Sequence, residues 1–138
     1  MQSLLIIAPF FVLTAYADLA TEHTKLKKIQ TECETKLGEP KNLFIKMIED
    51  EYIGETQKAG KMALCIITGM GILNQDGVLI ADNFKVHVER LVEDEDKRKT
   101  IIDTCGQIKG SGPEENALNF VKCMEDNVPR AIAKEFLK

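Results

Sequence analysis

The sequence predicts an all-α fold, and three observations support this prediction. The 138-residue chain has no Trp and only 6% aromatic residues, whereas Glu, Lys, Ile, Leu and Ala, which favour helices, are abundant. Apolar residues recur every three or four positions in several segments. No segment shows the sustained apolar–polar alternation of a strand. We therefore expect six to seven short helices with short connections.

The N-terminus has the layout of a secretory signal peptide. A ten-residue apolar run, Leu4–Leu13, is too short to span a bilayer, which needs about 20 residues. The A-x-A pattern at Ala15–Ala17 follows, and charged residues begin directly after it. No Lys or Arg precedes the run, and Pro9 interrupts it. We expect residues 1–17 to be a signal peptide and 18–138 to be one secreted domain; a frayed N-terminal helix is the weaker alternative.

The first two expected helices are joined by a proline. The helix over residues 18–37 has one apolar face, made of Leu19, Leu26, Ile29, Cys33 and Leu37. Gly38 and Pro40 end this helix, and proline suits the first turn of the next one. That second, short helix covers residues 41–52.

The third expected helix, residues 55–70, is the most apolar part of the domain. From Gly60 to Leu73 its only polar side chains are Lys61 and Thr68. A helix that is apolar on nearly every side must be surrounded by other helices. We therefore expect it to be the central helix, with Gly69 and Gly71 ending it and allowing close approach.

The remaining helices are separated by turn residues. Residues 73–78 (LNQDGV) form a turn, and Asp82 is expected to cap a fourth helix with the apolar stripe Phe84, Val88 and Leu91. A fifth helix over 93–110 starts with acidic residues, which the helix dipole favours. A capping box from Ser111 to Glu114 would begin the sixth helix, buried through Ala117, Phe120, Val121 and Met124. A tail helix over 130–138 completes the domain.

Four cysteines in a chain with a signal peptide predict two disulfides. Four cysteines can pair in three ways. The helix assignment favours the pairing Cys33–Cys65 with Cys105–Cys123 but does not exclude the other two. A four-thiolate zinc site would need close pairs, but the closest cysteines have 17 residues between them. A catalytic thiol is disfavoured because an even set of cysteines should be fully paired.

Charge and motifs exclude several classes of function. The net charge of −4 and the absence of a basic patch argue against nucleic-acid binding. No apolar stretch after the first is long enough for membrane insertion. The turn at 73–78 resembles part of a calcium loop, but Asn83 stands where a bidentate Glu is required. The sequence has no G-x-S-x-G motif and no phospholipase-type His–Asp pair. We therefore expect that the protein is not an enzyme and that it binds no metal and no cofactor.

The cysteine pattern resembles that of the insect odorant-binding proteins, the pheromone and general-odorant carriers. Members have six cysteines, with three residues between the second and third and eight between the fifth and sixth. Three residues lie between Lys61 and Cys65, and eight lie between Glu114 and Cys123, so Lys61 and Glu114 stand at the positions of the missing pair. Joint loss of these two bonded cysteines is the mark of the Minus-C subclass. The resemblance covers the whole mature chain.

The resemblance implies helices around a hydrophobic cavity, with the disulfides Cys33–Cys65 and Cys105–Cys123. The residues alone leave a plain packed core as an equal alternative. The implied function is a secreted carrier of odorants, pheromones or related lipophilic molecules. Residues chosen by helix face as candidate ligand contacts are Met47, Ile48, Tyr52, Met62, Ile66, Met70, Phe84, Val88, Leu91, Ile101, Phe120, Val121, Met124 and Phe136.

Several alternatives stay open at this point. A secreted helical signalling protein with a packed core would also fit two disulfides, and the carrier fold also serves in haemolymph and reproductive secretions. His87 falls on the same face as Phe84 and Leu91. His87 could act as a pH switch, because imidazole titrates near neutral pH. We favour the alternative that it is an ordinary histidine at the surface or at the boundary of the core. The ligand, the tissue, a weak homodimer and a receptor contact are not decided by the sequence.

Overall fold

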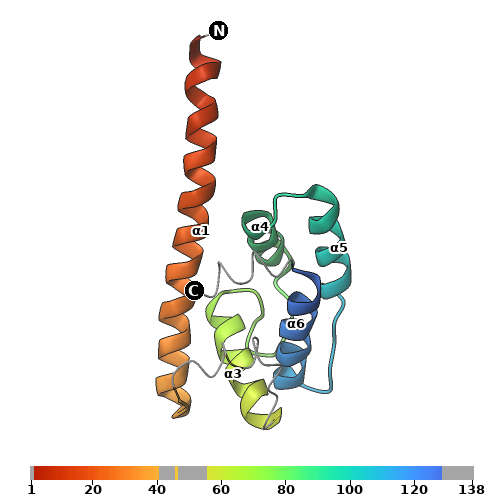
Figure 1. The fold of residues 1–138 in the computed structure, drawn as a ribbon. Helices are drawn as coiled ribbons and strands as arrows, with labels where there is room; N and C mark the ends of the chain where they lie inside the picture. The colour runs from red at the N-terminus through yellow and green to blue at the C-terminus, as the bar shows by residue number, and fades with distance from the viewer. Residues whose placement is uncertain (1, 41–45, 47–55, 129–138) are drawn as a thin grey trace.

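The computed structural model describes residues 2–40, 46 and 56–128, and this part of the chain is built from helices (Figure 1). They are α1 (Gln2–Leu37), α3 (Thr56–Gly69), α4 (Ala81–Leu91), α5 (Glu95–Cys105) and α6 (Pro113–Asn127). Extended pairing is limited there to one bridge, between Leu73 and Leu79. The all-α prediction is confirmed. The expected helices at 41–52 and 130–138 lie, apart from Lys46, outside the described residues.

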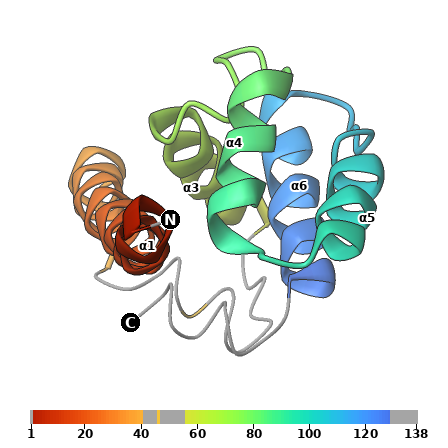
Figure 2. The same cartoon turned by 90° about the horizontal axis from the view of Figure 1, so that it is seen from above.

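The helix α3 lies between α1 and α6, as its apolar sequence predicts. It contacts both of them, and its contact with α6 is the most extensive in the fold. The helix α5 packs against α4 and α6 on the side of the domain opposite α1 (Figure 2). A smaller contact joins α1 to α4. Thus α1 is attached to the rest of the domain through α3 and α4.

The helix α1 is longer than predicted, because it begins at Gln2 rather than at Asp18. Its N-terminal part extends past the other helices (Figure 1). The predicted start was set by the expected signal-peptide cleavage, and no helix-breaking residue lies at that point. The C-terminal end agrees with the prediction. Gly38 has φ 67°, and the N–H of Glu39 donates to the C=O of Glu34 at 2.9 Å, which closes the helix.

One apolar core joins all five described helices and the loop after α3. In α3, Met62, Ala63 and Ile66 have no exposed surface. Phe84 of α4 meets Phe120 of α6 edge to face, with ring centroids 5.2 Å apart and an interplanar angle of 74°. The apolar segment of α3 therefore serves as the centre of the core.

The turn after α3 is confirmed, and it contacts the start of α6. The side-chain Oδ1 of Asn74 accepts hydrogen bonds from the N–H groups of Asp76 (2.9 Å) and Val78 (3.0 Å). Gly77 has φ 77°, in the left-handed region that favours glycine. A Cβ atom at Gly77 would lie 2.6 Å from Pro113 Cα, so the turn and α6 approach too closely for a side chain.

Gly77→Ala should therefore destabilise the fold by about 2–3 kcal/mol, combining backbone strain with a clash against Pro113. Gly38→Ala is the matched control, because Gly38 also has a positive φ but nothing within 4 Å of the added Cβ. It should cost only about 1 kcal/mol. Urea unfolding of both variants measures the difference, and equal losses would show that the contact with Pro113 is not limiting.

The predicted caps of α4 and α5 differ from the observed ones. Asp82 lies in the first turn of α4 and does not cap it; the N-cap is Ile80, without a side-chain hydrogen bond. Residues 93–110 were expected in one helix, but α5 ends at Cys105 because Gly106 caps it. Its N-cap is Asp94, whose side chain accepts from the N–H of Lys97 at 3.0 Å. The predicted acidic first turn of α5 is confirmed.

The predicted capping box at the start of α6 is wrong by one residue. The N-cap is Gly112 and Pro113 takes the first helical position. Proline is favoured there because its fixed φ suits the helix and its missing N–H has no intrahelical partner. The hydroxyl of Ser111 donates instead to the carboxylate of Glu115.

Candidate functional site

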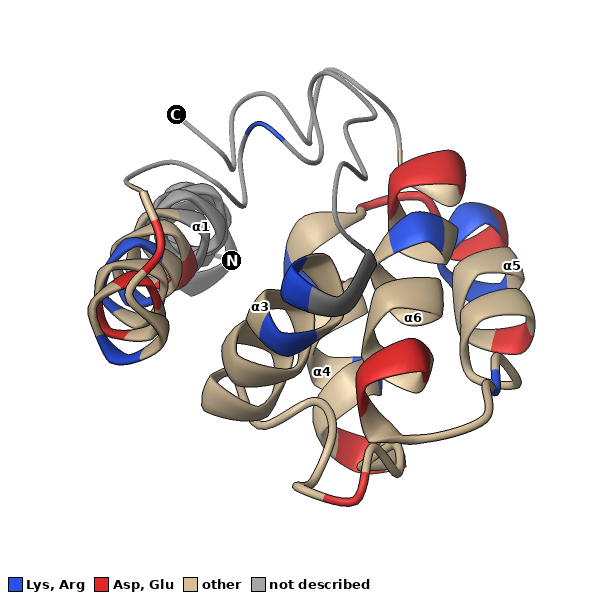
Figure 3. Cartoon of the chain, turned by 90° about the horizontal axis from the view of Figure 1, so that it is seen from below, with Lys and Arg blue, Asp and Glu red and all other residues tan. Residues whose placement is uncertain are grey.

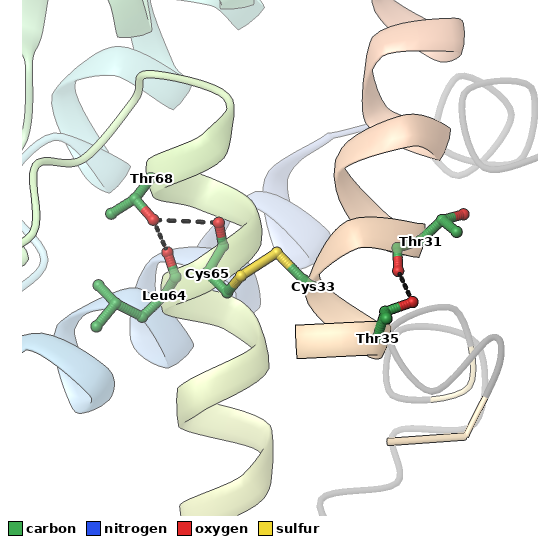
Figure 4. The surroundings of a disulfide bond; sticks show 6 residues. All are labelled: Thr31, Cys33, Thr35, Leu64, Cys65 and Thr68. Carbon is green, nitrogen blue, oxygen red and sulfur yellow. Dashed lines mark hydrogen bonds between the residues drawn. A yellow bond between two sulfur atoms is a disulfide. The ribbon is translucent and has the colours of Figure 1, made fainter. Parts of the chain in front are cut away.

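Two disulfides connect the helices around the core. Cys33 of α1 is bonded to Cys65 of α3, and Cys105 of α5 to Cys123 of α6, with Cα–Cα distances of 5.9 and 5.6 Å. Figure 4 shows the first bond crossing from α1 to α3. All four cysteines lie in the described part of the chain and are paired. The pairing implied by the resemblance is confirmed.

The candidate ligand contacts that the structure describes come together in one apolar cluster. They belong to α3, α4, α5 and α6 and the loop after α3, and their side chains meet although they are distant in sequence. Those that are buried are Met62, Ile66, Phe84, Val88, Leu91, Ile101, Phe120 and Val121. Met70 and Met124 are partly buried and pack against this cluster. The candidates Met47, Ile48, Tyr52 and Phe136 lie outside the described residues.

Polar side chains on the inner face of α1 are site features that the sequence analysis missed. Glu22, Gln30 and Glu34 are 5%, 3% and 7% exposed. The inner face was predicted from the spacing of hydrophobic residues alone, so polar residues on it were not assigned. The spacing of four between Leu26, Gln30 and Glu34 was the available signal that they share a side of the helix.

The buried carboxylate of Glu22 forms a polar cluster with His87 and with the partly exposed Arg90 of α4. His87 Nδ1 lies 3.4 Å from Glu22 Oε2, and the guanidinium of Arg90 donates to the other carboxylate oxygen. His87 is 9% exposed, so the favoured surface or boundary position is wrong. The hydrogen bond with His87 lowers the pKa of Glu22 most, burial raises it, and Arg90 lowers it further, giving a pKa of about 2 instead of 4.5.

Glu22→Gln should lower the free energy of unfolding at pH 7 by on the order of 2 kcal/mol, allowing for the partial exposure of Arg90 to solvent. The depressed pKa contributes stability that is present above pH 4.5, the unfolded value, and is lost as the pH falls toward 2. The difference between wild type and variant should therefore narrow over that range in urea titrations. Glu32→Gln, on the exposed side of α1, is the control. If both variants lost the same free energy of unfolding at every pH, the stabilising role of the Glu22 cluster would be contradicted.

A comparison with known protein families decides the classification. The sequence model of the PBP/GOBP family matches residues 15–127, most of the chain. The chain belongs to the PBP/GOBP family. The resemblance to insect odorant-binding proteins is thus confirmed, and this family consists of helical binding proteins rather than enzymes.

Two curated relatives match over most of their length. The B1 protein and the B2 protein of Tenebrio molitor are each 25% identical to this chain over 112 residues, or 81% of it. These alignments cover 85% and 86% of the relatives. No solved structure matches significantly.

A surface groove is lined by residues of α1, α3 and α6 and includes Lys61 and Glu114, the two positions that the cysteine resemblance singled out. Its volume is about 640 Å³, and Lys61 and Glu114 both line it beside the Cys33–Cys65 bond. In Figure 3, α3 carries basic positions and the first turn of α6 acidic ones. A Cβ atom at Gly60 would lie 3.1 Å from Glu114 Cβ, so α3 and α6 approach closely here without a covalent bond.

The described part of the chain contains neither a cluster of metal-ligating side chains nor a helix that could span a membrane. No group of three or more His, Cys, Asp or Glu side chains in that part of the chain could hold a metal ion. No helix in the same part is long and apolar enough to cross a lipid bilayer.

Proposed function

We propose that this PBP/GOBP-family chain is a secreted carrier that binds one small hydrophobic molecule non-covalently among its helices. Residues 1–17 would be removed as a signal peptide, leaving 18–138 as the ligand-binding domain. The observation that supports this most directly is the single apolar cluster formed by the described candidate residues. Odorants and pheromones are the proposed ligand classes, with carriage of other lipophilic molecules in haemolymph or reproductive secretions as the alternative.

Burial of an apolar ligand supplies enough free energy for this function. Each CH₂ group moved out of water contributes about 0.8 kcal/mol. A ten-carbon alcohol could therefore reach micromolar affinity, about −8 kcal/mol, without any ion pair. Met62, Met70 and Met124 belong to or adjoin the cluster. Flexible methionine side chains can adapt the walls of a site to ligands of different shape.

A fluorescence titration tests this function. The oxidised domain, residues 18–138, would be titrated with N-phenyl-1-naphthylamine, whose emission rises in apolar surroundings. Bound probe would then be displaced with volatiles, terpenoids and fatty acids. Saturable one-to-one binding and micromolar displacement would support a carrier. Absence of binding by folded protein would contradict it and favour the alternative of a helical signalling protein with a packed core.

A further inference from the structure

The Cys33–Cys65 disulfide lines the surface groove between α1 and α3. Both cysteines belong to the lining of this groove, whose volume of about 640 Å³ is within the range of small-molecule sites. Cys65 is partly exposed, whereas Cys33, Cys105 and Cys123 are at most 8% exposed. A small molecule that enters the groove therefore reaches the bond from the side of Cys65.

The Cys105–Cys123 disulfide is covered. Neither of its cysteines lines this groove or the neighbouring one, which Pro113 lines. The side-chain amide of Asn127 donates to the C=O of Cys123 at 2.7 Å, and its nitrogen lies 3.5 Å from Sγ of Cys123 and 3.9 Å from Sγ of Cys105. Because both cysteines are buried and an amide lies against their sulfur atoms, a reagent reaches this bond only after local unfolding.

We propose that Cys65 is a site of modification by small thiols, and that thiol–disulfide exchange opens the Cys33–Cys65 bond in the folded protein while Cys105–Cys123 stays oxidised. The nucleophile is the thiolate of a low-molecular-weight thiol, for which glutathione serves as the probe. It forms a bond to Sγ of Cys65, and the Cys33–Cys65 bond breaks. The electron pair of that bond leaves on Cys33, which takes up a proton from water. The product carries a mixed disulfide on Cys65 and a free thiol on Cys33.

The charges around the groove do not exclude an anionic thiolate. Lys36 and Lys61 line it together with Glu32 and Glu114, so neither sign of charge dominates the lining. The rate of exchange depends on the thiolate fraction of the attacking thiol and on access to the sulfur atom. The attacking thiol is the same for both disulfides, so access is the property that distinguishes them.

Exchange at Cys65 removes the covalent bond between α1 and α3. The helix α1 then keeps its apolar contacts and the ion pair of Glu22 with Arg90 of α4. Ile29 of α1 and Ile66 of α3 belong to the same apolar cluster, so a loosened α1 exposes part of that cluster. The expected consequence is a lower ligand affinity. This consequence rests on the proposed carrier function, whereas the selective exchange does not.

Mass spectrometry tests the selectivity. The full-length chain, produced in a secreting host, would be incubated with glutathione at neutral pH without denaturant. The reaction would be stopped with N-ethylmaleimide, and the modified cysteines would be identified in peptides. Cys33 and Cys65 should be modified at least about tenfold faster than Cys105 and Cys123.

Unfolded protein is the control for this selectivity. In concentrated urea, which removes the difference in access, the two bonds should react at rates within about threefold of each other. Equal rates in the folded protein, or faster reaction at Cys105–Cys123, would overturn the inference.

Two substitutions at Lys61 test the groove as the route to the sulfur. Lys61 is exposed on α3 and lines the groove one helical turn before Cys65. Lys61→Trp narrows the groove, whereas Lys61→Gln removes the same charge without adding bulk. Exchange at Cys65 should be slower in Lys61→Trp than in Lys61→Gln by about threefold or more. Equal rates for these two variants would show that the thiol does not enter through the groove.

Probe binding separates this inference from the carrier function. After exchange at Cys65, the protein should bind N-phenyl-1-naphthylamine several-fold more weakly than untreated protein. Selective exchange with unchanged probe affinity would overturn the proposed effect of α1 on ligand binding. If untreated protein binds no probe, the carrier function fails, and the peptide analysis still decides whether exchange is selective for Cys33–Cys65.

Discussion

Removal of the Cys33–Cys65 disulfide should lower the free energy of unfolding by about 3–4 kcal/mol. The bond closes a loop between residues 32 positions apart, and release of that loop raises the entropy of the unfolded chain. Such a loss is a large part of the 5–15 kcal/mol typical of small domains. Urea unfolding of the Cys33→Ala, Cys65→Ala double variant measures it, and the melting temperature should fall by roughly 10–20 °C.

The second disulfide provides the comparison. Cys105 and Cys123 are 18 positions apart, so the entropic contribution of their bond is smaller by about 0.5 kcal/mol. Their double alanine variant should lose almost as much stability. The two variants should differ in which part of the fold is destabilised, since only loss of Cys33–Cys65 frees α1 from α3. Hydrogen exchange should then rise first in α1. A loss below about 1 kcal/mol for Cys33–Cys65 would show that α1 is held mainly by its apolar contacts and by Glu22.

The helix faces were predictable because apolar spacing records burial directly. Leu26, Ile29 and Cys33 were assigned to the inner face of α1, and all three are buried. The central position of α3 followed from its nearly all-apolar sequence. Gly69, at which α3 ends, allows the predicted close approach because a side chain there would collide with Ile29. The apolar candidates were brought together for the same reason.

Helix boundaries and buried polar contacts were harder to predict. The observed start of α6 differs from the predicted one by one residue. Pro113 and Ser111 are both local signals for the first turn of a helix and are similar in strength. The cluster of Glu22 with His87 and Arg90 is a long-range contact, since Glu22 and Arg90 are 68 positions apart in the sequence. Helical spacing assigns a face to each residue but does not show which helix that face meets. The polar side of the candidate site was therefore missed.

Phe84→Ala should be the most destabilising single substitution considered, at about 3–5 kcal/mol. Phe84 is 1% exposed and packs edge to face on Phe120. Truncation removes buried apolar surface, leaves a cavity and abolishes the ring contact, which alone contributes about 0.5–1.5 kcal/mol. Val86→Ala on the same helix is the control, since Val86 is 43% exposed, and its effect should stay within about 0.5 kcal/mol. Urea unfolding of both variants compares them.

Ligand binding separates two roles that Phe84 can have. If Phe84 is also a wall of the proposed ligand site, its removal enlarges the site beside Phe120. An apolar ligand that fills the added space should then raise the melting temperature of Phe84→Ala more than that of wild type at the same concentration, because a ligand stabilises by its affinity for the folded state. If the ligand-induced increase matches that of Val86→Ala and of wild type, Phe84 acts only in the core. The ligand would then bind among the other members of the apolar cluster.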